Sequence, residues 1–177
     1  METDSSGRQW IYSGGGPLIL LDQRWLKEWQ GHDREQYERG EETDYDRACA
    51  VADILGILPV GGGHGLIFND EPMSTTWWRS ETTDHVILIR WVYAETDTAV
   101  TAAMKEPLAV TWTASGIIFT ATTAQIILFD SAYAGEKIEE SLPIPLAAGS
   151  YTVETAECEP DAKTALVLHR FLPVSAE

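Results

Sequence analysis

The chain has 177 residues, of which 44% are hydrophobic and 23% charged, so it is long enough for one hydrophobic core and is unlike a disordered chain. Its 28 acidic and 12 basic residues give a net charge of −16, which disfavours nucleic acid and anionic lipid as partners. The N-terminus lacks the features of a secretory signal, and no apolar run approaches the ~20 residues of a membrane span. We therefore expect a single cytoplasmic domain over residues 8–177.

The first elements surround a run of glycines. WIYSGGGPLIL predicts two short strands, over residues 10–12 and 18–21, on either side of residues 14–16. A phosphate-binding turn would need a lysine or the start of a helix after the glycines, whereas a strand follows here. We therefore interpret the glycines as a backbone bend.

A short helix and an acidic stretch come next. Asp22 caps a helix whose Trp25, Leu26 and Trp29 share one face and which ends before Gly31. Residues 32–46, HDREQYERGEETDYD, hold seven acids and two arginines, which predicts a solvated segment.

A second helix is expected to begin at Thr43 or Asp44. Its buried face would carry Tyr45, Ala48, Cys49, Ala52 and Leu55, and Gly56 would cap its C-terminus. Residues 57–60 and 65–68 then flank GGGH and predict a β-hairpin.

The rest of the chain is dominated by β patterns. Residues 69–85 predict an irregular connection, in which Trp77 and Trp78 face opposite sides and one lies near solvent or a partner. Residues 86–93, VILIRWVY, predict a central strand covered on both faces, and residues 96–105 predict a helix with Lys105 in its last turn. After Pro107, β-rich runs separated by turns predict an antiparallel sandwich or a bent sheet.

These patterns together predict an α+β fold. A few short helices in the N-terminal part would pack on a mainly antiparallel sheet, and the C-terminal part would be a β-sandwich-like run of strands. A variant of this prediction divides the domain into two lobes, residues 8–105 and 106–177.

No motif points to catalysis, a metal ion or a cofactor. Ser115 lies in TASGI, which lacks the first glycine of GxSxG, and the acidic stretch lacks the EF-hand pattern. Cys49 and Cys158 are far apart in sequence, and we expect both to be reduced thiols in the core. We predict no catalytic residue, no metal and no cofactor.

Three charged residues in apolar surroundings define the alternative function. Arg90, Asp130 and Arg170 each need a partner if buried, and an ion pair of either arginine with Asp130 or Asp70 would supply one. If they instead converged with a histidine in a closed pocket, the chain would be a small-molecule-binding or enzymatic β-rich domain. An assembly subunit with symmetric apolar interfaces is a third interpretation.

Eight segments occur in this order along the chain: WIYSGGGPLIL, DYDRACAV, DILGILPVG, LIFNDEPMSTTW, IRWVYAE, LFDSAYAG, LAAGSYTV and LHRFLP. Together they resemble the immunity protein 21 family of bacterial polymorphic toxin systems. The acidic insertion between Gly31 and Thr43 departs from the family pattern by its length. The resemblance implies a non-enzymatic protein that neutralises a cognate toxin, often a nuclease. Family motif positions without an assigned role are Trp10, Gly15, Pro17, Asp46, Arg47, Asp70, Glu71, Arg90, Asp130 and Tyr151.

A basic toxin would be met best by carboxylates beside aromatic anchors. Two places in the sequence combine them, and the first, within residues 33–46, is preferred over the second, around the adjacent tryptophans. The candidate partner-binding residues are Glu35, Tyr37, Glu38, Glu41, Glu42, Asp44, Tyr45, Asp46, Asp70, Glu71, Trp77 and Trp78. We predict an immunity protein that blocks the active site of a basic, nuclease-type toxin domain.

Overall fold

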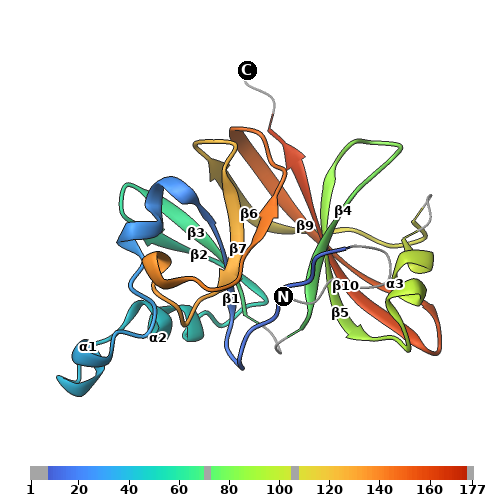
Figure 1. Cartoon of the computed structure of the whole chain (residues 1–177). Helices are drawn as coiled ribbons and strands as arrows, with labels where there is room; N and C mark the ends of the chain where they lie inside the picture. Colours follow the sequence, from blue (N-terminus) through green and yellow to red (C-terminus); the bar gives the residue numbers. More distant parts are fainter. Residues whose placement is uncertain (1–7, 70–72, 105–107, 175–177) are drawn as a thin grey trace.

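The computed structural model describes residues 8–69, 73–104 and 108–174, and these form two antiparallel five-stranded sheets with short helices outside them (Figure 1). The predicted class, short helices with mainly antiparallel sheet, is confirmed. No helix of these residues has the length and apolar character needed to cross a bilayer.

The first sheet has the strand order β2-β3-β1-β7-β8. The predicted glycine hairpin is β2–β3, and its turn contains Gly61 at φ 55°, a left-handed conformation that suits glycine. Pro59 lies in β2 at the edge of the sheet, where a missing N–H breaks no ladder bond. The strands are β1 (Leu18–Asp22), β2 (Leu55–Val60), β3 (Gly63–Phe68), β7 (Ile126–Asp130) and β8 (Leu142–Ile144).

The second sheet has the strand order β4-β5-β10-β9-β6. Its strands are β4 (Thr75–Arg79), β5 (Val86–Tyr93), β6 (Thr113–Ala121), β9 (Gly149–Asp161) and β10 (Thr164–Pro173). The sequence predicted β5 with the same bounds. Each sheet combines strands from before and after residue 106, so a division of the chain there does not separate the sheets.

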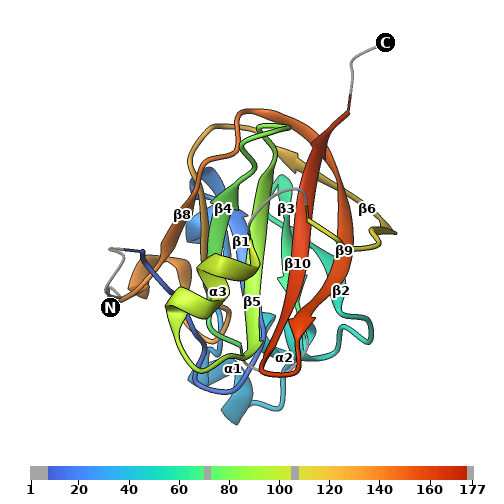
Figure 2. The same ribbon diagram turned by 90° about the vertical axis from the view of Figure 1, so that its right-hand side faces the viewer.

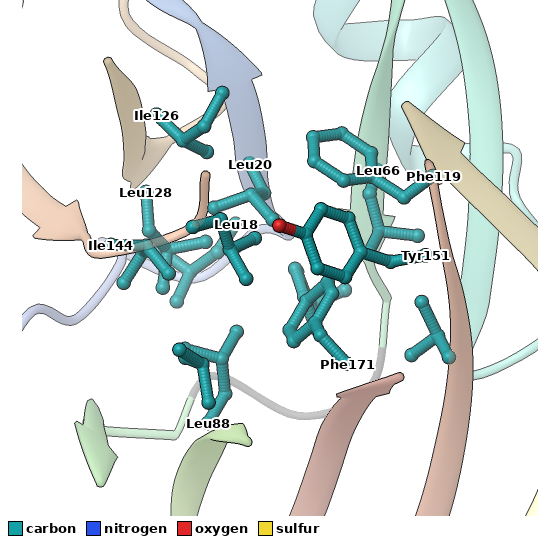
Figure 3. Packing of buried hydrophobic residues seen from close by; sticks show 14 of the residues in the cluster. Leu18, Leu20, Leu66, Leu88, Phe119, Ile126, Leu128, Ile144, Tyr151 and Phe171 are labelled. Atoms are coloured by element: carbon teal, nitrogen blue, oxygen red, sulfur yellow. The ribbon is translucent and has the colours of Figure 1, made fainter. Parts of the chain in front are cut away.

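An apolar layer between the two sheets forms the main core (Figure 3). Alternate residues of each strand point into it, because neighbouring side chains of a strand face opposite sides. The first sheet contributes Leu18, Leu20, Leu66, Ile126, Leu128 and Ile144, and the second contributes Leu88, Phe119, Tyr151 and Phe171.

Short helices cover the outer faces of both sheets. On the first sheet, the 3₁₀ helix η1 (Gln23–Glu28) and α2 (Asp44–Cys49) bring Trp25, Trp29 and Ala48 onto a second apolar cluster. On the second sheet, α3 (Asp97–Ala103) packs Val100 over β5 and β10 (Figure 2). The predicted caps Asp22 and Thr43 are confirmed, since both side chains accept hydrogen bonds from first-turn amides.

The predicted helix beginning at residue 43 or 44 is wrong in its length and in its buried face. It ends at Cys49, so Cys49 and Ala52 are exposed while Leu55 and Gly56 belong to β2. The i, i+3, i+4 spacing favours a longer helix, but residues from Leu55 onwards can also pair with β3. The strand forms instead of the helix because it buries Leu55 between the sheets. Of the two thiols expected in the core, only that of Cys158 is buried, which raises its pKa.

Two further sequence predictions need correction. Residues 69–85 are not one irregular connection, because Thr75–Arg79 is strand β4, whose Thr and Trp residues favour a pleated sheet. Trp77 packs on the inter-sheet core and Trp78 on the outer cluster, so the predicted opposite facing is confirmed. Residues 10–12 form no full strand, and only Ile11 bridges to Thr75. Asp70, Glu71 and Lys105 lie outside the described residues.

His169 is a polar residue in the middle of the sandwich. It is fully buried, its Nδ1 lies 2.9 Å from the Thr155 hydroxyl, and its ring packs on Phe68 with 5.2 Å between centroids. Burial, and in second place the charge of Arg90, lower the pKa of His169 from 6.5 to about 3. The imidazole is therefore neutral in the folded protein over the physiological pH range.

This buried histidine predicts a loss of stability in mild acid. Because its folded pKa lies below its unfolded value, the unfolded chain takes up the proton first, so the contribution is present above pH 6.5 and is lost as the pH falls towards 3. Between pH 7 and pH 5, the free energy of unfolding of the wild type should fall by about 2 kcal/mol relative to His169→Asn. Urea unfolding of both proteins at the two pH values measures this difference, and an unchanged difference would contradict the assignment.

Candidate functional site

The bend at residues 14–16 is held by protein groups. The Gly14 amide donates to Asp130 Oδ2 at 2.9 Å, and the Ser13 hydroxyl donates to the Gly16 carbonyl at 2.5 Å. Gly15 has φ 136°, which favours glycine. Because the Gly14 amide already donates to the Asp130 carboxylate, the bend has the structural role that the sequence indicates.

The acidic segment, residues 33–46, is docked on this bend. The Tyr45 ring packs against Gly16 so closely that a Cβ at residue 16 would overlap it. Burial and the neighbouring Cys49 raise the pKa of Tyr45 to about 12, so its hydroxyl stays protonated. At the other end of the segment, the His32 amide donates to the Ala132 carbonyl at 2.9 Å. Both contacts fix the acidic segment to the first sheet.

Hydrogen bonds within the acidic segment fix its two helices, α1 (Arg34–Glu38) and α2. Thr43 and Asp46 form a reciprocal capping box at the start of α2, with bonds of 2.9 and 3.1 Å. The Thr43 amide and hydroxyl both donate to the Asp46 carboxylate, which lowers the pKa of Asp46. Asp44 accepts from the Gln30 amide at 2.8 Å and pairs with Arg47 at 2.7 Å. Three candidate residues, Asp44, Tyr45 and Asp46, therefore hold the segment in place.

The remaining candidates in the segment are exposed. Glu38 pairs with Arg34 at 2.7 Å and Glu41 with Arg39 at 2.8 Å, whereas Glu35 and Glu42 form no ion pair with any described residue. The Tyr37 side chain of the same segment is 61% exposed, and its ring centroid lies 5.2 Å from that of His32. Carboxylates and an aromatic side chain thus lie on a surface whose backbone is fixed.

The tryptophan pair lies elsewhere, on β4 of the second sheet. Trp77 and Trp78 line an open hollow of about 650 Å³ together with Arg8 and Arg79. Arg8 lies 4.9 Å from the Trp78 ring centroid, and Arg79 donates to the Pro145 carbonyl at 3.0 Å. The described part of this hollow contains two cations and one acid, Glu81, and so differs in charge from the acidic segment.

The three residues behind the alternative function do not converge. Asp130 bonds to backbone amides, and Arg170 pairs with its cross-strand partner Glu154 at 2.7 Å and stacks over Trp112. The expected ion pairs of Asp130 with Arg90 or Arg170 are therefore wrong. Asp130 accepts from backbone amides and Arg170 pairs with Glu154, while the buried Arg90 lies over the Phe68 ring. The alternative partner Asp70 lies outside the described residues. Among residues 8–69, 73–104 and 108–174, no three His, Cys, Asp or Glu side chains are grouped to hold a metal ion.

A groove between the edge strands β2 and β6 is the feature that the sequence did not reveal. It is open, has a volume of about 1120 Å³, and is lined by residues 53–57, 109–111, 113–118, 155–157 and 159. Its acids are Asp53, Glu157 and Glu159, and its described lining contains no basic residue. These segments are distant in the chain, so only the strand order could have brought them together.

The structure thus defines a protein with an anchored acidic surface and an open groove, and with no converging catalytic group in its described part. The chain belongs to the immunity protein 21 family, whose model matches residues 9–164. This is a family of non-enzymatic immunity proteins of polymorphic toxin systems, which bind cognate toxins. Searches of curated proteins and of solved structures gave no significant match.

The packing of Tyr45 on Gly16 predicts a site-specific effect of one methyl group. Gly16→Ala should destabilise the protein by about 1–3 kcal/mol, because the new Cβ displaces the Tyr45 ring from the bend. Gly14→Ala is the matched control, since the nearest atom to its Cβ would be Asp130 Oδ2 at an ordinary 3.8 Å. Chemical denaturation of the two variants tests this, and equal stabilities would show that Tyr45 does not depend on Gly16.

Proposed function

We propose that this chain protects the cytoplasm of its own cell by covering the active site of a basic, nuclease-type toxin domain with the acidic segment. The observation that carries the proposal is the exposed Tyr37, which shares with the exposed Glu35 and Glu42 a segment anchored beside the first sheet. A nuclease attracts phosphates with positive charge, and carboxylates can occupy the same place.

The anchoring supports this proposal energetically. A flexible acidic loop would lose conformational freedom on binding, and this loss would reduce its affinity. Here the capping box, the Asp44–Gln30 bond and the Tyr45–Gly16 contact order the segment before any partner arrives. A tyrosine on such a surface supplies a large contact area at low entropic cost.

The net charge supports a steering role for the same surface. At −16 the whole molecule attracts a cationic partner from a distance, and the exposed carboxylates orient the encounter. Isothermal titration calorimetry against an inactivated toxin domain encoded immediately upstream tests the proposal, with a 1:1 complex as the expected result. Absence of binding would contradict it.

Charge reversal tests the acidic segment itself. Glu35→Lys with Glu42→Lys changes two exposed carboxylates that hold no arginine in the described structure, so the fold should be unaffected. Association with the toxin domain should slow by about 10-fold at low salt and should depend less on ionic strength. The control is Glu136→Lys with Glu139→Lys, an equal charge change on another exposed segment. If both pairs slow association equally, only net charge matters and the interface lies elsewhere.

Tyr37→Ala separates affinity from steering. Because anchors at an interface act mainly on dissociation, the variant should dissociate about 10-fold faster or more, with a nearly unchanged association rate. Surface plasmon resonance measures both rates. Tyr93→Ala, which removes another exposed tyrosine on β5 of the second sheet, is the control. An unchanged dissociation rate for Tyr37→Ala would remove this residue from the proposed interface.

A further inference from the structure

The groove between β2 and β6 lies where the free edges of the two sheets come side by side (Figure 2). The Thr120 amide of β6 donates to His64 Nε2 of β3 at 2.9 Å and closes one end. Burial lowers the pKa of His64, which keeps the imidazole neutral and able to accept this bond. From there the groove runs along Ile118 towards Thr113.

Strand β2 presents unused backbone groups to this groove. The Ile54 carbonyl accepts from Asn69 on the side of β3, whereas the Pro59 carbonyl accepts from Arg47 on the other side. Because backbone groups of a strand alternate in direction, the N–H and C=O groups of Leu55 and Ile57 point away from β3, as the carbonyl of Pro59 does. This is the geometry with which an edge strand receives a further strand.

Strand β6 does not fill that place. Between Ala114 and Ile118 its pairing with β9 shifts register, and within this bulge the Ser115 hydroxyl donates to the Val153 carbonyl at 2.6 Å. Gly116 in the bulge has φ 75°. A bulge disrupts the regular ladder of the strand that contains it, and β6 belongs to the other sheet and does not pair with β2. The groove occupies the space between the two edges.

The side chains around the groove are apolar within an acidic rim. Ile54, Ile57 and Ile118 are 49%, 37% and 55% exposed, and they come from both walls. Asp53, Glu157 and Glu159 are exposed beside them, without a basic residue in the described lining. Exposed apolar side chains together with charges of one sign characterise a binding surface for a partner of the opposite charge.

We infer that the groove receives an extended, cationic segment of the toxin, which pairs with the free edge of β2 and places lysine or arginine side chains against the three carboxylates. This inference rests on the proposed function and adds a second contact to it. A second copy of this chain suits the groove poorly, because each copy carries a charge of −16. The opposite side of the sandwich suits a cationic segment poorly, because Arg8 and Arg79 line it.

Two pairs of variants test the groove against the upstream toxin domain in inactive form. Glu157→Lys with Glu159→Lys should weaken binding by about 10-fold, while Glu136→Lys with Glu139→Lys should change it less than about 2-fold. Ile118→Thr should weaken binding by about 5-fold or more. Val92→Thr is its matched control, because Val92 is a similarly exposed residue of the same sheet outside the groove.

Amide hydrogen exchange of the full chain locates the contact. Toxin binding should slow exchange at Leu55 and Ile57 and along Thr113–Ile118, and the variants should abolish this protection. If the toxin binds but leaves these amides and the variant affinities unchanged, the groove inference fails while the proposed function stands. If no toxin binds, both fail. Concentration-dependent protection in the chain alone would overturn the inference in favour of self-association.

Discussion

The apolar layer between the two sheets is the contact on which every other feature of this molecule depends. It buries one face of each sheet, and the short helices and indoles cover the other faces. A sandwich closed only by face-to-face packing leaves four edge strands, and the chain treats its two sides differently. On the β4–β8 side, Arg79 reaches across to the Pro145 carbonyl. On the β2–β6 side, His64 of β3 accepts a hydrogen bond from the Thr120 amide of β6, and the open groove lies between the two edges.

The position of the acidic segment depends on strand pairing in the first sheet. Strands β1 and β7 pair directly, which places Asp130 beside the glycines that precede β1. Asp130 thereby fixes the bend, and the Tyr45 ring packs on the backbone of Gly16 within it. Because Gly16 has no side chain, the Tyr45 ring can approach its backbone closely. Tyr45 belongs to α2, so this contact also places α2 beside the bend. The chain of contacts therefore runs from sheet pairing through a carboxylate and a glycine to the orientation of the exposed acids.

Local patterns in the sequence were sufficient for elements whose signals agree. Strand β5 has a continuous β-branched run, and the β2–β3 hairpin has both alternation and glycines, so both could be predicted. The end of α2 could not, because a helical spacing and a strand spacing overlap at Leu55 and only tertiary burial decides between them. Among the candidate residues, Asp44, Tyr45 and Asp46 were found by composition, but composition cannot distinguish a capping carboxylate from a free one. The groove unites Asp53 with Glu157, and no local signal relates residues so far apart.

The two surfaces are linked by a short stretch of chain, and this link bears on how they would act together. Helix α2 ends at Cys49, and Asp53 and Ile54 already line the groove. Solvent-exposed carboxylates at the rim of an interface mainly govern the rate of encounter, because exposed ion pairs contribute little to the stability of the complex. Backbone pairing, and isoleucines that become buried when the partner binds, mainly govern the lifetime of the complex. A partner held first by the acidic segment would experience the neighbouring groove at a high effective concentration, so even a weak strand contact there would prolong the complex markedly. Steering and retention would thus be assigned to different residues, in the acidic segment and in the groove.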